Sequence, residues 1–125
     1  MTDLTDVQSH RAASVALSAE EIAALPWDPS EWGGVTRHLW EDRQTGSVAG
    51  VLALSPGEAH TRHVHRAMTH HVWILSGSLS VGNELLGRGA YTCTAAGSQH
   101  GPESAGPEGC QLFYVLVPVH TGSGR

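Results

Sequence analysis

Turn-forming clusters recur every eight to twelve residues from Val35 onward, and this regular spacing constrains the fold more than any other feature of the chain. The clusters are rich in Gly, Pro, Ser and Asn, and they separate short apolar or β-branched runs. No helical pattern of useful length follows Pro26. The pattern predicts an all-β sandwich or barrel, with strands near 35–42, 48–54, 60–66, 70–75, 78–81, 84–86, 90–94, 99–103 and 111–117.

The residues before this pattern predict a short helical or irregular head, residues 1–34, followed by the β-domain at 35–125. Residues 1–17 lack periodicity and are expected to form an arm. Ser18 and Glu21 have the spacing of a capping box, which predicts a helix over 18–25 that ends before Pro26. We expect residues 27–34 to form a loop and the head to dock against the outside of the β-domain.

Composition excludes several classes of function. The 125 residues fit one domain, and seven scattered arginines against 12 carboxylates leave no basic groove for a nucleic acid. The longest apolar run, Leu112 to Val117, is far shorter than the ~18 residues of a membrane span. With no recognisable signal peptide, a cytoplasmic location is expected. In such a compartment Cys93 and Cys110 are expected to be free thiols packed as small hydrophobes.

Histidine is concentrated where chemistry is expected. Five of the nine histidines lie within twelve residues (His60, His63, His65, His70 and His71), and His100 follows a glycine-rich stretch. Strand alternation places His63 and His65 on one face. It also places His70 with Val72 and Ile74 on the core face, and His71 on the opposite face. A buried imidazole needs a polar partner, and a metal ion is one.

Two motifs in this region resemble those of the cupin superfamily. The first consists of Gly57, five residues, His63-Val64-His65, four residues, His70, six residues and Gly77. The second consists of Gly89, five residues, Ala95-Ala96-Gly97-Ser98-Gln99-His100, three residues and Ser104. The resemblance implies an all-β cupin double-stranded β-helix, a jelly-roll barrel. It also implies one divalent transition metal ion, Fe, Zn or Ni, held by His63, His65, His70 and His100, with His70 where cupins usually have glutamate.

We do not expect the remaining polar residues near the motifs to bind the metal. We expect His60 and His71 to lie at the surface or behind the metal ligands. Glu58, Gln99, Tyr91 and Tyr114 could reach the metal pocket, but we favour roles in packing. The sequence assigns no catalytic or substrate-binding residue beyond the metal ligands.

Four neutral ligands would leave the ion its full positive charge, which favours an anionic, oxygenated small-molecule substrate. The chain is similar to small cupins that include diketone- and acetophenone-cleaving dioxygenases, anti-sigma-factor cupins and cupin polyketide cyclases. A dioxygenase acting on a diketone- or hydroxyketone-like substrate is the interpretation that we favour. The alternatives are a redox-neutral zinc or nickel cyclase or isomerase, and a metal- or ligand-binding sensor without catalysis. Because both faces of 111–117 are apolar, we also expect a homodimer that covers the outer face.

Overall fold

The protein is almost entirely β-structure, as the turn pattern predicts. The computed structural model describes residues 14–60, 63–64, 67–100 and 103–119. Its elements are α2 (Ala19–Ala23), β1 (Asp28–Pro29), β2 (Val35–Asp42), β3 (Ser47–Leu54), β4 (Ala59–His60), β5 (His63–Val64), β6 (Met68–Val81), β7 (Glu84–Gly87), β8 (Tyr91–Thr94), β9 (Gln99–His100) and β10 (Glu103–Pro118).

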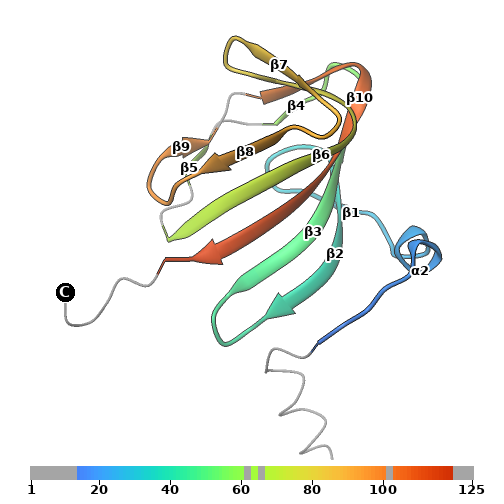
Figure 1. Cartoon of the computed structure of the whole chain (residues 1–125), viewed down its shortest axis with the longest axis vertical. Helices are drawn as coiled ribbons and strands as arrows, with labels where there is room; N and C mark the ends of the chain where they lie inside the picture. The colour runs from blue at the N-terminus through green and yellow to red at the C-terminus, as the bar shows by residue number, and fades with distance from the viewer. Residues whose placement is uncertain (1–13, 61–62, 65–66, 101–102, 120–125) are drawn as a thin grey trace, which may run out of the picture.

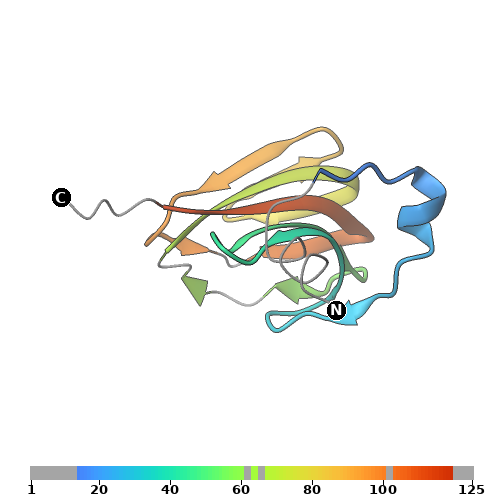
Figure 2. The ribbon, with the colours of Figure 1, turned by 90° about the horizontal axis from the view of Figure 1, so that it is seen from below.

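The strands form two antiparallel layers that share the two longest strands, β6 and β10 (Figures 1 and 2). The strand order β1-β2-β3-β10-β6-β7 defines the main sheet, with β8 paired to the first half of β6 and β4 paired to the start of β10. A separate two-stranded sheet, β5–β9, lies beside β8 (Figure 1). This is the jelly-roll arrangement expected from the resemblance.

The layers are joined where β6 and β10 bend together. The register of β10 against β6 shifts between Ala105 and Cys110 and again between Gln111 and Leu112. At the bend Gly77 has a positive φ of 73°, and a Cβ there would collide with the carbonyl of Gly109. Glycine at position 77 therefore allows the two strands to turn in close contact.

The bend also explains where the predicted strands differ from the structure. The predicted strands 70–75 and 78–81 are one strand, β6, because the Ser76-Gly77-Ser78 cluster forms an irregularity within it and not a loop. Residues 104–110, expected as a loop, belong to β10 for the same reason. The predicted strand 60–66 is represented by β4 and β5, and the remainder of that stretch lies outside the described residues.

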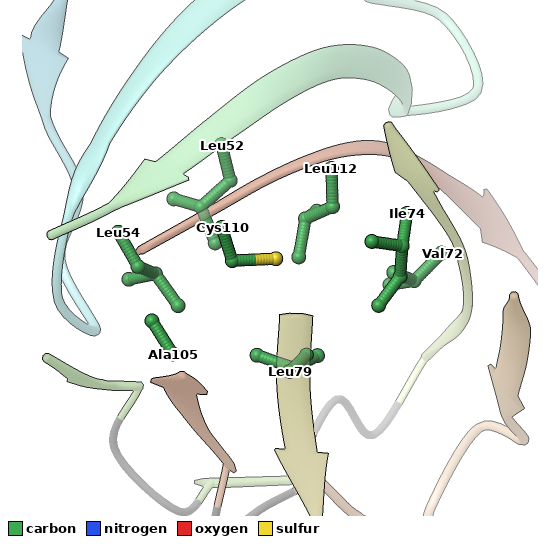
Figure 3. Packing of buried hydrophobic residues seen from close by; sticks show 8 residues of the cluster. All are labelled: Leu52, Leu54, Val72, Ile74, Leu79, Ala105, Cys110 and Leu112. Atoms are coloured by element: carbon green, nitrogen blue, oxygen red, sulfur yellow. The ribbon is translucent and has the colours of Figure 1, made fainter. Parts of the chain in front are cut away.

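A small apolar core fills the space between the layers (Figure 3). Ile74, Leu79 and Leu112 are fully buried at its centre. They pack with inward side chains of β3, β6 and β10, namely Leu52, Leu54, Val72, Ala105 and Cys110. Both cysteines are free, as expected, but Cys93 is exposed and so does not pack as a small hydrophobe.

Within the described part of the head, residues 14–34, the stretch around α2 packs against the outside of β2, where the head is expected to dock. Ser18 caps α2, and Ser18 and Glu21 form both hydrogen bonds of the capping box. Arg37 on β2 donates hydrogen bonds to the carbonyls of Ala23 and Leu25, and its guanidinium lies 3.9 Å from the ring centroid of Trp27. In the described ranges, no helix is long and apolar enough to cross a bilayer.

Candidate metal centre

Adjacent histidines on β6 face opposite sides of the sheet. His70 shares its parity with Val72 and Ile74, and all three side chains are buried. Trp73, by contrast, is 52% exposed. His71 has the parity of Trp73 and accepts or donates a 2.7 Å hydrogen bond between its Nδ1 and the hydroxyl of Tyr91. The strand therefore directs His70 into the barrel and His71 onto the outer face, as strand alternation predicts.

A tyrosine accompanies His70 inside the barrel. The rings of His70 and Tyr114 lie edge to face with centroids 6.2 Å apart, and the Tyr114 hydroxyl is hydrogen-bonded to the Thr36 hydroxyl at 2.7 Å. Tyr114 is paired with Gly50 on β3, where a Cβ would collide with the tyrosine hydroxyl. The missing side chain at Gly50 therefore makes room for the ring. Tyr114 contributes to packing, as expected, but it does so directly beside a candidate ligand.

His63 and His100 are direct partners in the small sheet. In the β5–β9 ladder, His63 is the Cα partner of His100 and Val64 is that of Gln99. Short connections join β5 to the start of β6 and the end of β8 to β9, so this ladder adjoins the end of the main sheet where His70 is paired with Thr94. The backbone therefore brings together three strands that carry candidate ligands (Figure 1). His65, the fourth candidate, lies outside the described residues.

A second polar pair is formed by one residue three positions before His63 and one residue three positions after His100. His60 on β4 is the Cα partner of Glu103 on β10, and both side chains are buried. His60 is thus not at the surface, one of the two positions expected for it. No role is predicted for Glu103 from the sequence, because its burial depends on the pairing of β10 with β4 and β6.

The pKa of the Cys110 thiol is raised in this interior. Burial raises the pKa of Cys110 to about 11, and the negative charge of Glu103 adds to the rise. Both residues are buried, and electrostatic interactions between buried groups are screened less than at the surface.

The three other polar residues expected near the metal pocket differ in position. The Glu58 carboxylate accepts hydrogen bonds from the backbone N–H groups of Gly34, at 3.0 Å, and Ser55, at 2.8 Å, so it fixes the loop before β4, which agrees with the packing role expected. Tyr91 lies on the outer face, and Gln99 is paired with Val64. Within the described side chains no three His, Cys, Asp or Glu groups converge as metal ligands; the side chains of His63, His65 and His100 are not among those described.

Most of the chain matches the model of one protein family. The family model of the ChrR cupin-like domain matches residues 16–120. The chain belongs to this cupin family. The jelly-roll barrel and the two histidine motifs are thus features of a cupin.

Several known proteins are similar to this cupin over most of its length. The tetracenomycin polyketide synthase protein TcmJ from Streptomyces glaucescens is 29% identical over 118 residues, covering 88% of this cupin and 79% of TcmJ. An acetylacetone dioxygenase from Acinetobacter johnsonii has a TM-score of 0.65 at 16% identity, over 84% of this chain and 73% of that one. KdgF from Halomonas sp. also has a TM-score of 0.65 at 16% identity, over 87% and 97% of the two chains. At these identities the solved structures establish the shared barrel.

Proposed function

We propose that this cupin is a metal-dependent enzyme that acts on a small oxygenated organic substrate bound at a divalent transition metal ion. The proposed ligands are His63, His65, His70 and His100. The observation that carries the proposal is the register of β5 and β9, which makes His63 and His100 direct partners beside the strand that buries His70. Directly opposed residues of an antiparallel pair lie close enough to share a ligand.

The donor chemistry fits such an ion. Cupin relatives commonly bind a divalent metal, and imidazole suits iron, zinc and nickel alike. A bound dication would act as a Lewis acid toward a chelating oxygen compound and favour its anionic form. The chain would hold the ion by these four imidazoles, with Tyr114 packed against that of His70.

Within this class, we propose a dioxygenase that cleaves a diketone- or hydroxyketone-like substrate. The structural similarity to an acetylacetone dioxygenase supports this proposal. The second candidate is a redox-neutral zinc or nickel cyclase or isomerase, and the sequence similarity to a polyketide synthase protein favours it. A sensor that binds a metal or ligand without catalysis is the third.

One experiment separates the dioxygenase from the other two candidates. Protein purified without added metal would be analysed for its metal content and then tested for oxygen consumption with β-diketones and hydroxyacetophenones. We expect about one iron per chain and oxygen consumption that depends on substrate. Bound zinc or nickel with no oxygen consumption would favour the cyclase or the sensor, and protein that binds no metal in any form would refute the proposed site.

We further propose that a second copy of the chain covers part of the outer face. A cross-strand row runs from Arg37 through Val51, Phe113 and Trp73 to Tyr91, and its most exposed members lie at the end away from the head. Val51 is buried, whereas Trp73 and Tyr91 are about half exposed. We call His71, Trp73, Tyr91, Phe113 and Val115 the outer patch. It lines an apolar hollow of about 120 Å³, and an aromatic surface of this kind is typical of the centre of a protein interface.

A further inference from the structure

A single tyrosine on the inner face of the barrel connects His70 with strand β2. Tyr114 on β10 is the Cα partner of Val72 on β6, so His70 is its diagonal neighbour on the same face. The rings of Tyr114 and His70 lie edge to face, with centroids 6.2 Å apart and an interplanar angle of 61°. Aromatic rings prefer contacts of this kind. Tyr114 is therefore a direct neighbour of the buried imidazole.

The hydroxyl of this tyrosine is anchored two strands away, on β2. It forms a 2.7 Å hydrogen bond with the hydroxyl of Thr36, which is only 7% exposed. Strand β3 lies between β2 and β10, and a Cβ at Gly50 on β3 would collide with the Tyr114 hydroxyl and with the carbonyl of Arg37. The glycine thus leaves a path over β3. The side chain of Tyr114 follows this path from β2 and contacts the ring of His70 on β6.

The inner and outer histidines of β6 differ in how a tyrosine contacts them. On the outer face the Tyr91 hydroxyl is hydrogen-bonded to Nδ1 of His71 at 2.7 Å, and the two rings are stacked with centroids 6.0 Å apart. On the inner face the tyrosine hydroxyl is bonded to Thr36, and Tyr114 meets His70 through its ring. A hydrogen bond to a ring nitrogen occupies an atom that a metal ion needs, whereas a ring contact does not. Tyr114 therefore restricts His70 through a contact that leaves the ring nitrogens to other partners.

Such a restriction matters because the backbone alone does not fix the plane of an imidazole. The torsion between Cβ and the ring is broad in histidine. Strand alternation thus sets the face to which His70 points, and neighbouring groups must set the orientation of its ring. Metal-binding histidines are commonly held in orientation by residues behind them. A ring that is oriented before the ion arrives loses less conformational entropy on binding.

We propose that Tyr114 is a positioning residue that holds the imidazole of His70 in the orientation in which it binds the metal ion. The ring contact restricts the imidazole, and the hydrogen bond to Thr36 anchors the tyrosine. This inference rests on the proposed function, since it takes His70 as a ligand. Because Thr36 acts only through the tyrosine, the two hydroxyl groups should affect metal binding as one unit.

Binding of cobalt(II) alone tests this role, because the visible absorption bands of the ion depend on its coordination geometry. Metal-free protein would be titrated with cobalt(II) chloride, and the affinity and the bands recorded together. Tyr114→Leu removes the ring and should alter the bands and weaken binding about 10-fold, at the lower end of the 10–100-fold loss usual for residues that orient metal ligands. Tyr114→Phe and Thr36→Val keep the ring but remove its anchor, so both should lie between the wild type and Tyr114→Leu. The double variant Tyr114→Phe/Thr36→Val should lose no more affinity than either single variant, because both changes remove the same hydrogen bond.

The outer tyrosine provides the matched control. Tyr91→Leu is the same substitution beside the neighbouring histidine, and it should leave the cobalt affinity and bands unchanged. Leu86→Ala on β7 removes a side chain that packs against the core, and it controls for a general loss of stability. It too should keep the wild-type bands.

The outcomes for Tyr114 and His70 distinguish failure of this inference from failure of the proposed function. Wild-type affinity and bands in a folded Tyr114→Leu protein, or the same change in Leu86→Ala, would overturn the role of Tyr114. If Tyr114→Leu does not fold, wild-type behaviour of both Tyr114→Phe and Thr36→Val would overturn it. Loss of cobalt binding in His70→Ala would leave the proposed metal site standing in each of these cases. Wild-type affinity and bands in His70→Ala, or a wild type that binds no cobalt, would instead refute the proposed function.

Discussion

The two faces of the sheet formed by β3, β10, β6 and β8 are both rich in apolar side chains, but only one of them is a core. On the inner face Ile74 and Leu112 are sealed from water, whereas on the outer face Trp73 and Tyr91 remain 52% and 54% exposed. The same alternation separates two neighbouring histidines, with His70 among buried residues and His71 on the outer patch. Strand parity, more than hydrophobicity, thus decides which residues share an environment.

The largest difference between the faces should appear in stability. Leu112→Ala removes a fully buried side chain from the centre of the core and should lower the free energy of unfolding by about 2–5 kcal/mol. Leu75→Ala, on the outer face, should cost less than about 1 kcal/mol because Leu75 is already 41% exposed. Urea unfolding monitored by Trp fluorescence measures both. Equal losses would show that the two faces are not distinguished as the structure indicates.

A smaller effect concerns the inner thiol at alkaline pH. Because the pKa of Cys110 is about 11 in the folded protein against an ordinary 9.0, the native state holds this proton more tightly than the unfolded chain. Its contribution is complete below pH 9 and is lost as the pH rises to 11, by roughly 2 kcal/mol. Unfolding curves from pH 8 to 11 should therefore fall more steeply for the wild type than for Cys110→Ala. Parallel curves would contradict the raised pKa.

Association should depend on the outer patch. Trp73→Ser should weaken the proposed dimer by at least about 2 kcal/mol, or roughly 30-fold in Kd, as is usual for an aromatic residue at the centre of an interface. Leu85→Ser, at an even more exposed apolar residue on β7, should leave the dimer intact. Light scattering over a concentration series distinguishes the two. A wild type that is monomeric at micromolar concentration would refute the dimer.

The smallest expected difference is between two tyrosine hydroxyls. Tyr114→Phe removes the hydrogen bond to the buried Thr36 and should cost about 0.5–1.5 kcal/mol of stability. Tyr91→Phe removes the bond to His71 on the outer face and should change stability by less than about 0.5 kcal/mol. A larger loss for Tyr91→Phe in thermal unfolding would mean that the outer patch contributes more to the fold than its exposure suggests.

Much of this comparison could be predicted from the sequence, because it depends on local patterns. The strand over 35–42 and the capping box of Ser18 and Glu21 are where the sequence places them. The opposite orientation of His70 and His71 also follows from alternation alone. These features depend on residues within one strand or one turn, and no long-range pairing is needed to predict them.

The features that could not be predicted depend on pairing between distant segments. Gly77 and Gly109 belong to clusters that usually mark loops, and only their contact shows that they allow two long strands to bend together. Glu103 received no role because its inward orientation is fixed by pairing with His60 and Val81. The ladder that pairs His63 with His100 depends in the same way on the fold.

The measurement that tests the central claim most directly is the affinity of the His70 and His71 variants for a divalent metal. Zinc would be titrated against a chelating indicator with the wild type, His70→Ala, His70→Glu and His71→Ala, each verified as folded by circular dichroism. The inner histidine should determine zinc affinity, so His70→Ala should bind zinc at least 10-fold more weakly than the wild type. His70→Glu should retain binding, and His71→Ala should match the wild type. Unchanged affinity in His70→Ala, together with loss of binding in His71→Ala, would contradict a metal site inside the barrel.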